Sequence, residues 1–263
     1  MLQRRIEEVS LNSWPALQHI LFDGWILRFS EGYTKRANSV NSLSASSMDV
    51  NRKIDVCERL YARKGLPPIF RITPFSAPSD LDRALEVRGY RRAVLTSVLH
   101  LDLGNCPLPV QREAKRLLQP APAVELRHEQ LDDWMDVFYE LSDASTAGWE
   151  VHRRILQAIP SRRLLTSLAG TGRVVACGLG VLEGGYFGLF NLVTHPRWRN
   201  RGYGTKLVWG LLRWARDNRA RHAYLQMVTD NAPARRLYAK FGFQEMYRYW
   251  YRILDDGCEV LKV

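Results

Sequence analysis

The C-terminal half of the chain alternates apolar runs with helical patterns. The apolar run Tyr186–Val193 is typical of a buried strand, and Thr205–Arg216 follows it with a helical pattern. A second apolar run, His222–Val228, precedes the short helical stretch Asn231–Tyr238. The apolar residues of the longer helical stretch lie at the spacing of one helix face: Leu207, Leu211, Leu212 and Ala215. The pattern predicts strand, helix, strand and helix in that order.

A glycine-containing turn, Arg199-Asn200-Arg201-Gly202-Tyr203-Gly204, joins the first predicted strand to the first helix. This arrangement suits a pyrophosphate, because glycines let the backbone come close and first-turn N–H groups have no partner inside the helix. The helix dipole and the arginines favour the same negative charge. A Walker A loop is excluded by the missing Gly-Lys-Ser/Thr, and a dinucleotide fingerprint by Leu207 in place of its third glycine. The pattern predicts a phosphate-bearing ligand, with an ordinary tight turn as the alternative.

The motifs resemble those of the GNAT N-acetyltransferase superfamily in order, spacing and residue type. They are Arg199-x-x-Gly202-x-Gly204, then Asn231-x-x-Ala234-x-x-Leu237-Tyr238, then Gly242-Phe243. The resemblance covers about residues 123–254. It implies an α/β fold of the mixed α+β kind, with a mixed, mostly antiparallel sheet flanked by helices. It also implies acetyl-CoA as cofactor and an amine as acceptor.

The N-terminal half repeats the C-terminal pattern at one constant offset, so that Gly242-Phe243 falls on Gly89-Tyr90 and Lys206 on Lys53. The ligand-binding positions have changed in this first copy, where Arg199, Gly202, Gly204, Asn231 and Tyr238 fall on Ser46, Asp49, Asn51, Pro78 and Leu85. The sequence therefore predicts tandem GNAT folds with a degenerate first copy. Such a pair resembles two-domain bacterial GNAT proteins, and the segments Arg36–Val40 and Tyr247–Arg252 resemble one such group.

Prolines and glycine between the halves mark a connection. We expect a degenerate GNAT-like domain over residues 1–103, a linker over 104–122 with a short helix at Gln111–Leu118, and the catalytic domain over 123–263.

The resemblance also implies the residues that hold the cofactor. The strand Leu189–Thr194 is expected to splay from its neighbour and to offer backbone groups to the pantetheine arm, while the turn and the following helix cradle the pyrophosphate. Asn231 either contacts the cofactor arm or caps the helix that it begins. The expected cofactor-binding residues are Leu192, Val193, Arg199, Asn200, Arg201, Gly202, Tyr203, Gly204, Thr205, Asn231 and Tyr238.

The implied reaction is direct attack of a primary amine on acetyl-CoA in a ternary complex. Tyr238 is expected to protonate the departing thiolate, with core packing as the alternative. Glu183 is the candidate general base; Glu150, His152 or a water relay are alternatives. A backbone N–H near Val193 is expected to hold the oxyanion. The acceptor side is expected to come from Leu141–Ile159 and the first domain.

The acceptor is a small molecule or a protein, which the residues do not distinguish. Trp149 and Glu150 can stack on and pair with a cationic amine, or Trp149 can be a half-buried core residue. A non-catalytic acyl-CoA-binding or regulatory protein is the main alternative function.

Composition adds a net charge of +11 and a pI near 9.7, which are typical of nucleic-acid-binding proteins. The sequence contains no nucleic-acid-binding motif. Binding of an anionic cofactor also requires basic residues at the entrance of its site. A nucleic-acid-associated protein is therefore only a third interpretation. The hydrophobic content of 46% predicts a packed core, and the sequence has no transmembrane or signal segment. The four scattered cysteines indicate no metal site and a cytoplasmic location. A homodimer is left open.

Overall fold

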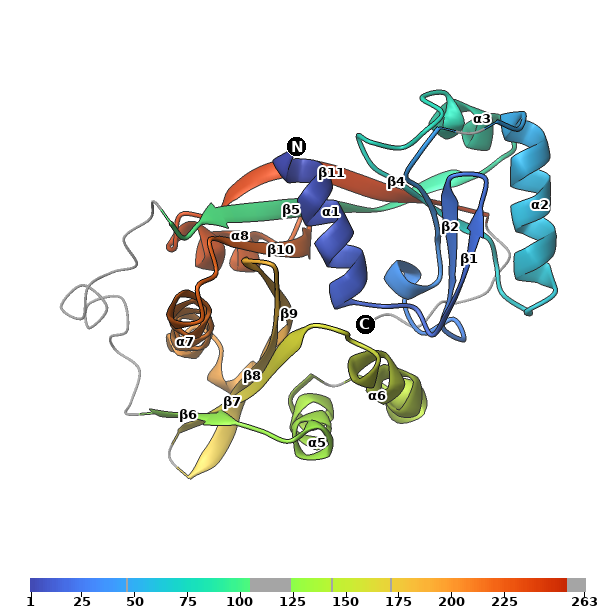
Figure 1. Ribbon diagram of the computed structural model, residues 1–263. Coiled ribbons are helices and arrows are strands. Elements are labelled where there is room, and N and C mark those ends of the chain that lie inside the picture. The colour runs from blue at the N-terminus through green and yellow to red at the C-terminus, as the bar shows by residue number, and fades with distance from the viewer. Residues whose placement is uncertain (46, 105–123, 143, 171, 255–263) are drawn as a thin grey trace. The chain divides into compact units, whose positions relative to one another are not determined.

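The computed structural model describes the chain except for residues 46, 105–123, 143, 171 and 255–263 (Figure 1). The strands have the order β1-β2-β3-β4-β11-β5-β10-β9-β8-β7-β6. Most of the neighbouring strands run antiparallel, and helices flank them. The expected fold class is thus confirmed.

The chain divides into two compact units, neither of which is continuous in sequence. Unit 1 consists of Met1–Ser13, Val98–Trp149 and Ile159–Met246, and unit 2 of Trp14–Ser97, Glu150–Ala158 and Tyr247–Val263. The expected boundaries at 103 and 123 remain predictions. Nearly all of the expected linker, with its helix Gln111–Leu118, lies outside the described residues.

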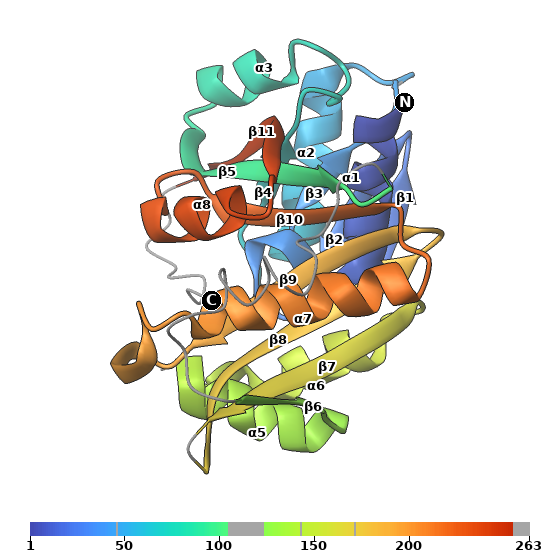
Figure 2. The same cartoon turned by 90° about the vertical axis from the view of Figure 1, so that its left-hand side faces the viewer.

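Unit 1 is built on the strand order β5-β10-β9-β8-β7-β6. Helices α5 and α7 lie on opposite faces of β8 and β9 (Figures 1 and 2). Strands β9 and β10 pair in parallel. The elements are α1 (Leu2–Ser13), β6 (Val124–His128), α5 (Leu131–Ser142), β7 (Arg162–Gly170), β8 (Arg173–Glu183), β9 (Tyr186–Thr194), α7 (Tyr203–Asp217), β10 (His222–Val228) and α8 (Ala232–Ala239).

In unit 2, β3 pairs in parallel with β4. Strands β5 and β11 contribute residues to both units. The elements are β1 (Gln18–Phe22), β2 (Trp25–Phe29), the 3-10 turn η1 (Lys35–Ala37), β3 (Val40–Ser42), α2 (Val50–Ala62), β4 (Ile69–Ile72), α3 (Leu81–Val87), β5 (Arg91–Asp102), α6 (Trp149–Gln157) and β11 (Gln244–Ile253).

Corresponding elements begin at the offset seen in the sequence. Helix α7 begins at residue 203 and α2 at residue 50, β10 begins at 222 and β4 at 69, and β11 begins at 244 and β5 at 91. In these three pairs the later element begins 153 residues after its counterpart. In both units a strand is followed by a helix and then by a strand that pairs in parallel with the first: β9, α7 and β10 in unit 1, and β3, α2 and β4 in unit 2.

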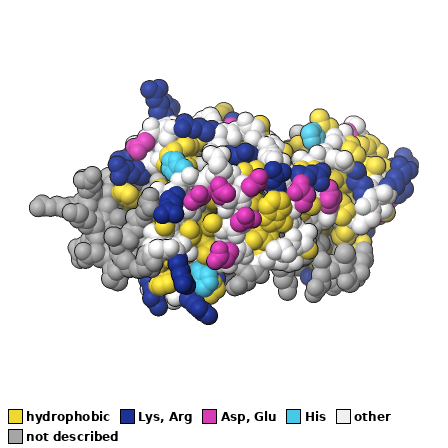
Figure 3. Space-filling view, turned by 90° about the horizontal axis from the view of Figure 1, so that it is seen from below, with side chains coloured by type: hydrophobic (Ala, Val, Ile, Leu, Met, Phe, Trp, Pro, Cys, Tyr) yellow, Lys and Arg dark blue, Asp and Glu magenta, His cyan; other side chains and the backbone are white. Residues whose placement is uncertain are grey.

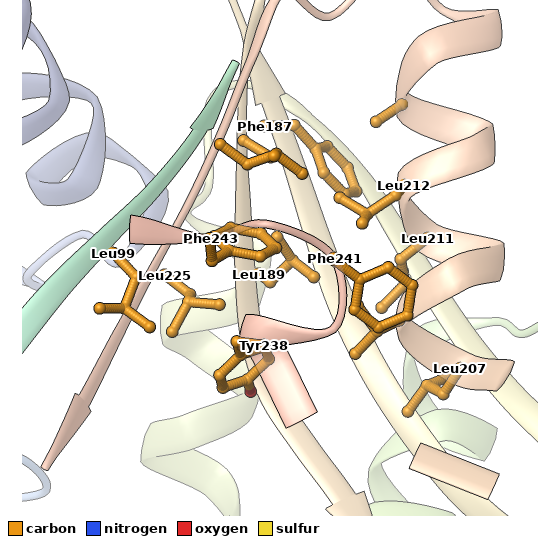
Figure 4. Packing of buried hydrophobic residues seen from close by; sticks show 14 of the residues in the cluster. Leu99, Phe187, Leu189, Leu207, Leu211, Leu212, Leu225, Tyr238, Phe241 and Phe243 are labelled. Atoms are coloured by element: carbon orange, nitrogen blue, oxygen red, sulfur yellow. The ribbon is translucent and has the colours of Figure 1, made fainter. Parts of the chain in front are cut away.

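The core of unit 1 packs the apolar face of α7 on the sheet (Figure 4). Leu207, Leu211 and Leu212, predicted from their helical spacing, are all buried there. Gly180 makes room for Phe187, because a Cβ at Gly180 would lie 2.2 Å from the ring. Among the described helices, none is long and apolar enough to cross a membrane.

Candidate functional site

Strands β9 and β10 of unit 1 part where the cofactor arm is expected. Their parallel register runs from Tyr186 opposite His222 to Leu189 opposite Leu225. Strand β9 continues to Thr194 and β10 to Val228, with no further pairing between them. Leu192 and Val193 lie on the stretch of β9 beyond Leu189, where the register with β10 has ended.

A bulge in β9 lies within the same stretch. Cys177 of β8 pairs with Val193, and Leu179 pairs with Phe190, so Gly178 stands opposite two residues. Asn191, one of those two, has φ of +49°, in the left-handed region that asparagine tolerates better than most residues. Bulges redirect a strand. The sequence analysis did not single out Asn191; an asparagine inside an apolar run was the signal available for it.

The turn between β9 and α7 has the backbone geometry of an anion site. Asn200 and Gly202 have φ of +61° and +82°. Gly202 is the N-cap of α7 and supplies no side-chain hydrogen bond to the first turn. The Arg199 side chain donates from Nε to the Thr194 carbonyl oxygen at 3.2 Å, which ties the turn to β9. The uncapped N–H groups of α7 favour a negatively charged ligand.

The predicted turn residues differ in their surroundings. The Tyr203 side chain packs in the core, with its ring centroid 6.1 Å from that of Trp198, and Thr205 is also buried. The Arg201 guanidinium lies 4.9 Å from the Trp198 ring centroid. Tyr203 and Thr205 can thus offer only backbone groups, or a shielded hydroxyl, to a ligand, whereas the arginines can offer charge.

Gly204 is the point where three predicted motif segments meet. A Cβ at Gly204 would lie 3.4 Å from Leu237 Cδ2 of α8 and 3.5 Å from Thr194 Oγ1 of β9. The start of α7, the end of β9 and helix α8 are therefore neighbours, although they are separated in sequence.

Asn231 begins α8 as a helix cap. Its Oδ1 accepts a hydrogen bond from the Ala234 N–H at 3.1 Å, and Pro233 follows in the first turn. The structure thus contains the capping interaction that was one of the two alternatives for Asn231. A contact between Asn231 and a cofactor stays a prediction.

Tyr238 lies on α8 at the edge of the core cluster. Its ring centroid is 5.8 Å from that of Phe243, and 7% of the residue is exposed. Figure 4 shows its phenolic oxygen directed away from Phe243 and Leu225. Burial raises the pKa of Tyr238 to about 12. The hydroxyl is therefore protonated at neutral pH, which is the form that a proton donor needs.

Glu183 lies at the end of β8 in a network of hydrogen bonds. Its carboxylate accepts from Arg5 Nη2 and Asn12 Nδ2 of α1, both at 3.1 Å, and from Ser161 Oγ at 3.4 Å. The residue is opposite Tyr186, and the β9–β10 register continues for three more pairs before the strands part. The carboxylate thus connects α1 to the β8–β9 hairpin, and its role as a base stays a prediction.

The other candidate bases lie on α6. His152 is fully buried between the rings of Trp14 and Tyr33, at centroid distances of 5.4 and 5.3 Å. Burial lowers the pKa of His152 to about 3, so its imidazole is too weak a base to deprotonate an ammonium group. Glu150 is exposed and Trp149 is half-buried.

Acidic side chains are also exposed on the surface of this basic protein. Helix α5 exposes a row of carboxylates at four-residue spacing, Asp132, Asp136 and Glu140. Figure 3 shows acidic side chains among the basic ones on the described part of the face seen from below. Among the described residues, no group of three or more His, Cys, Asp or Glu side chains is placed to hold a metal ion.

Comparison with protein families gives a match that spans nearly the whole chain. Residues 3–252 match the family described as "Probable histone acetyltransferase Rv0428c C-terminal". A curated relative, the "Uncharacterized N-acetyltransferase YobR" of Bacillus subtilis (strain 168), is 29% identical over 258 residues, covering 95% of this chain and 98% of the relative.

Solved structures share the fold at low sequence identity. A GCN5-related N-acetyltransferase from Kribbella flavida has a TM-score of 0.72 at 13% identity, covering 97% of this chain and 96% of that chain. A GCN5-related N-acetyltransferase from Sphaerobacter thermophilus has a TM-score of 0.64 at 16% identity, with 93% and 84% covered. A tandem GNAT protein from the clavulanic acid biosynthesis pathway has a TM-score of 0.56 at 19% identity, with 76% and 68% covered.

Proposed function

Because the chain belongs to the Rv0428c C-terminal family of GNAT acetyltransferases, we propose that it transfers the acetyl group of acetyl-CoA to a primary amine. The acceptor is an amine of a small molecule or of a protein. The observation that carries this proposal is the parting of β9 and β10 after Leu189 and Leu225, next to an uncapped helix N-terminus.

The residues of unit 1 fit the cofactor by position and chemistry. Backbone groups of Leu192 and Val193 lie on the stretch of β9 where the register with β10 has ended, and an extended pantetheine arm can add hydrogen bonds there as a strand would. The turn Arg199–Gly204 and the first turn of α7 offer N–H groups and positive charge to the pyrophosphate. A Cβ at Gly204 would be in ordinary van der Waals contact with Thr194 and Leu237, so the start of α7 packs closely on β9 and α8.

Tyr238 acts as the proton donor in this proposal. The amine attacks the thioester carbonyl carbon in a ternary complex, the carbon–sulfur bond breaks, and the phenol gives its proton to the departing sulfur. A backbone N–H near Val193 stabilises the oxyanion. The amine's own proton leaves through Glu183 or through water, and His152 is the weakest of the candidate bases because of its low pKa.

Unit 2 takes no cofactor in this proposal. The turn that corresponds to Arg199–Gly204 already holds two carboxylates of its own chain. Asp23 accepts from the Ser47 N–H at 3.1 Å and from the Met48 N–H at 3.0 Å, and Asp49 accepts from the Asn51 and Arg52 N–H groups at 3.1 Å. Lys53, whose side chain is fully buried, lies 3.3 Å from Asp23. These amides are satisfied without a phosphate.

A panel of amines with acetyl-CoA tests the proposed function. The panel contains small amines, aminoglycosides, amino acids and peptides, and a thiol reagent measures the release of CoA. At least one class of amine is expected to release thiol faster than hydrolysis alone. Acetyl-CoA binding without thiol release from any class would favour a non-catalytic acyl-CoA-binding protein.

A further inference from the structure

Two histidines lie side by side on neighbouring strands of unit 1. His100 belongs to β5 and His222 begins β10, and these strands are adjacent in the sheet. His100 Nε2 and His222 Nδ1 are 3.1 Å apart, and the two ring centroids are 5.2 Å apart. We call these two residues the histidine pair.

The histidine pair lies on the face of the sheet opposite to α7. Leu99 and Leu101 flank His100 in β5 and belong to the core cluster that includes the apolar face of α7. Ala223, which follows His222 in β10, belongs to the same cluster. Side chains alternate between the two faces of a strand, so both imidazoles project from the other face. Both residues are half-buried, so the pair lies outside the apolar core and keeps part of its surface in solvent.

The spacing of the two nitrogens matches that of a metal chelate. Zinc binds histidine nitrogen at about 2.0–2.1 Å, so two such nitrogens at neighbouring positions of a tetrahedral or octahedral ion are about 2.8–3.4 Å apart. The distance of 3.1 Å lies within this range. It is also the distance of a hydrogen bond, in which one imidazole donates its N–H to the other. The two strands therefore need not separate to exchange this hydrogen bond for an ion.

Contacts from the neighbouring strands hold the histidine pair in place. The Tyr186 ring of β9 stacks on His222, with ring centroids 5.0 Å apart and an angle of 28° between the planes. The same two residues are partners in the β9–β10 register. The Leu103 N–H of β5 donates to the Arg221 carbonyl oxygen at 2.8 Å, which ties β5 to the start of β10. Ligands that are already held lose less conformational entropy when they bind an ion.

The charges on β5 favour a cation at the histidine pair. Burial, followed by the neighbouring His222, lowers the pKa of His100, and the negative charge of Asp102 opposes both effects. His100 is therefore neutral at neutral pH, and the neutral imidazole is the form that binds a metal ion. Asp102 lies two residues along β5, on the same face as His100, and its carboxylate attracts a cation through space.

The arginine near the stacked tyrosine has acidic partners of its own. The Arg5 guanidinium lies 5.7 Å from the Tyr186 ring centroid. Its Nη1 and Nη2 are each 3.1 Å from a carboxylate oxygen, of Glu8 and of Glu183 respectively. These carboxylates offset the charge of Arg5, which reduces its repulsion of a bound cation.

We propose that the histidine pair of unit 1 binds a divalent late transition-metal ion such as Zn²⁺ or Ni²⁺. His100 Nε2 and His222 Nδ1 are the two protein ligands, and water completes the coordination. The imidazole that donates the present hydrogen bond moves its proton to its other ring nitrogen, so that both facing nitrogens offer a lone pair. Imidazole suits these ions, whereas Mg²⁺ prefers oxygen ligands.

The proposed ion joins β5 to β10 and so stabilises unit 1. The histidine pair lies at the opposite end of the β9–β10 register from Leu189 and Leu225, where the cofactor arm is proposed to bind. The metal site is therefore distinct from the proposed cofactor site and does not rest on the proposed function.

Titration calorimetry of the full chain tests the site with Zn²⁺, Ni²⁺ and Mg²⁺ as probes. The buffer contains no CoA and no other thiol, because thiolates bind the same ions. Zn²⁺ and Ni²⁺ are each expected to bind in a saturable way, and Mg²⁺ is expected not to bind. Zn²⁺ is also expected to raise the melting temperature, because it binds the folded state.

Two variants and two controls localise the effect. His100→Gln and His222→Gln each remove one ligand, and each is expected to abolish the site. His19→Gln, at an exposed histidine, is expected to keep it. The double variant of Cys106→Ser with Cys258→Ser removes the thiols that lie outside the described residues, and it is also expected to keep the site.

Three results would overturn the proposal. They are Zn²⁺ and Ni²⁺ binding no stronger than that of Mg²⁺, unchanged binding in folded His100→Gln or His222→Gln, and loss of binding in the double cysteine variant. If neither histidine variant folds, X-ray absorption of the zinc-loaded wild-type chain decides. Two histidine nitrogens at about 2.0–2.1 Å are expected, and a zinc shell without them contradicts the assignment.

Discussion

Leu189 of β9 and Leu225 of β10 form the last pair of a parallel register, and beyond them the two strands run on without pairing. The stretch of β9 that runs past the end of its register with β10 ends at Thr194, whose Oγ1 would be 3.5 Å from a Cβ at Gly204. The parting strands therefore lead directly to the turn that begins α7. This continuity connects the proposed pantetheine site with the proposed pyrophosphate site.

Gly202→Asp is expected to abolish the rise in melting temperature that acetyl-CoA produces in the wild-type chain. The substitution places a carboxylate beside the uncapped first turn of α7, where it competes with and repels the pyrophosphate. Thermal unfolding with and without acetyl-CoA measures the effect.

Gly185→Asp is the matched control for that variant. Gly185 lies in the same unit and has φ of +86°, close to the +82° of Gly202, so both substitutions impose similar backbone strain. The control is expected to keep the acetyl-CoA shift. An unchanged shift in folded Gly202→Asp would rule out the assigned pyrophosphate site.

Tyr238→Phe is expected to lower turnover on the order of 100-fold, with little change in acetyl-CoA affinity, because the hydroxyl acts only as the thiolate departs. Steady-state kinetics and calorimetry separate the two quantities. Tyr186→Phe, which removes a hydroxyl from a half-buried tyrosine of the same sheet, is expected to keep wild-type turnover. Full activity of Tyr238→Phe would mean that Tyr238 only packs.

The pH profile of turnover gives a further prediction for the same residue. Burial raises the pKa of Tyr238 to about 12, so the phenol keeps its proton through the neutral and moderately alkaline range. The contribution of Tyr238 is present below that pKa and is lost only as the pH approaches it. The ratio of wild-type to Tyr238→Phe turnover is therefore expected to stay constant between about pH 7 and about pH 10. A ratio that falls across this range would contradict the assignment.

Local patterns in the sequence were sufficient for the elements around the proposed site. The apolar face of α7, the glycine turn and the helix beginning at Asn231 each depend on neighbouring residues, and the structure has all three. The constant offset found in the sequence also separates α7, β10 and β11 from α2, β4 and β5 in the structure. These features are encoded by spacing, which a sequence displays directly.

Long-range packing could not be read in the same way. Glu183 was selected from its place beside two glycines, but its partners Arg5 and Asn12 lie more than 170 residues away in sequence. The residues of α1 belong to unit 1 and most of α6 belongs to unit 2, which no local pattern indicates.

Acid is expected to destabilise the chain through His152. Burial lowers the pKa of His152 from 6.5 to about 3, so the unfolded state binds a proton more readily than the folded state between these values. The stability that neutral His152 provides is complete above pH 6.5 and is lost as the pH falls towards 3. His152→Phe is expected to reduce the loss in unfolding free energy between about pH 7 and about pH 5 by about 2 kcal/mol.

Denaturant unfolding of both proteins at the two pH values measures this difference. His19→Gln, at an exposed histidine of β1, is expected to keep the wild-type pH dependence. An identical pH dependence for wild type and His152→Phe would show that His152 does not titrate as its burial implies.

Calorimetric titration of the full chain with acetyl-CoA tests the central claim most directly. The claim is that unit 1 holds the cofactor at its parting strands and glycine turn. Unit 2 holds none, because Asp23 and Asp49 already accept hydrogen bonds from the backbone amides of the corresponding turn. The expected stoichiometry is one acetyl-CoA per chain, with no binding by Gly202→Asp and still one per chain for Asp49→Gly. A stoichiometry near two, or binding that persists in folded Gly202→Asp, would contradict the account.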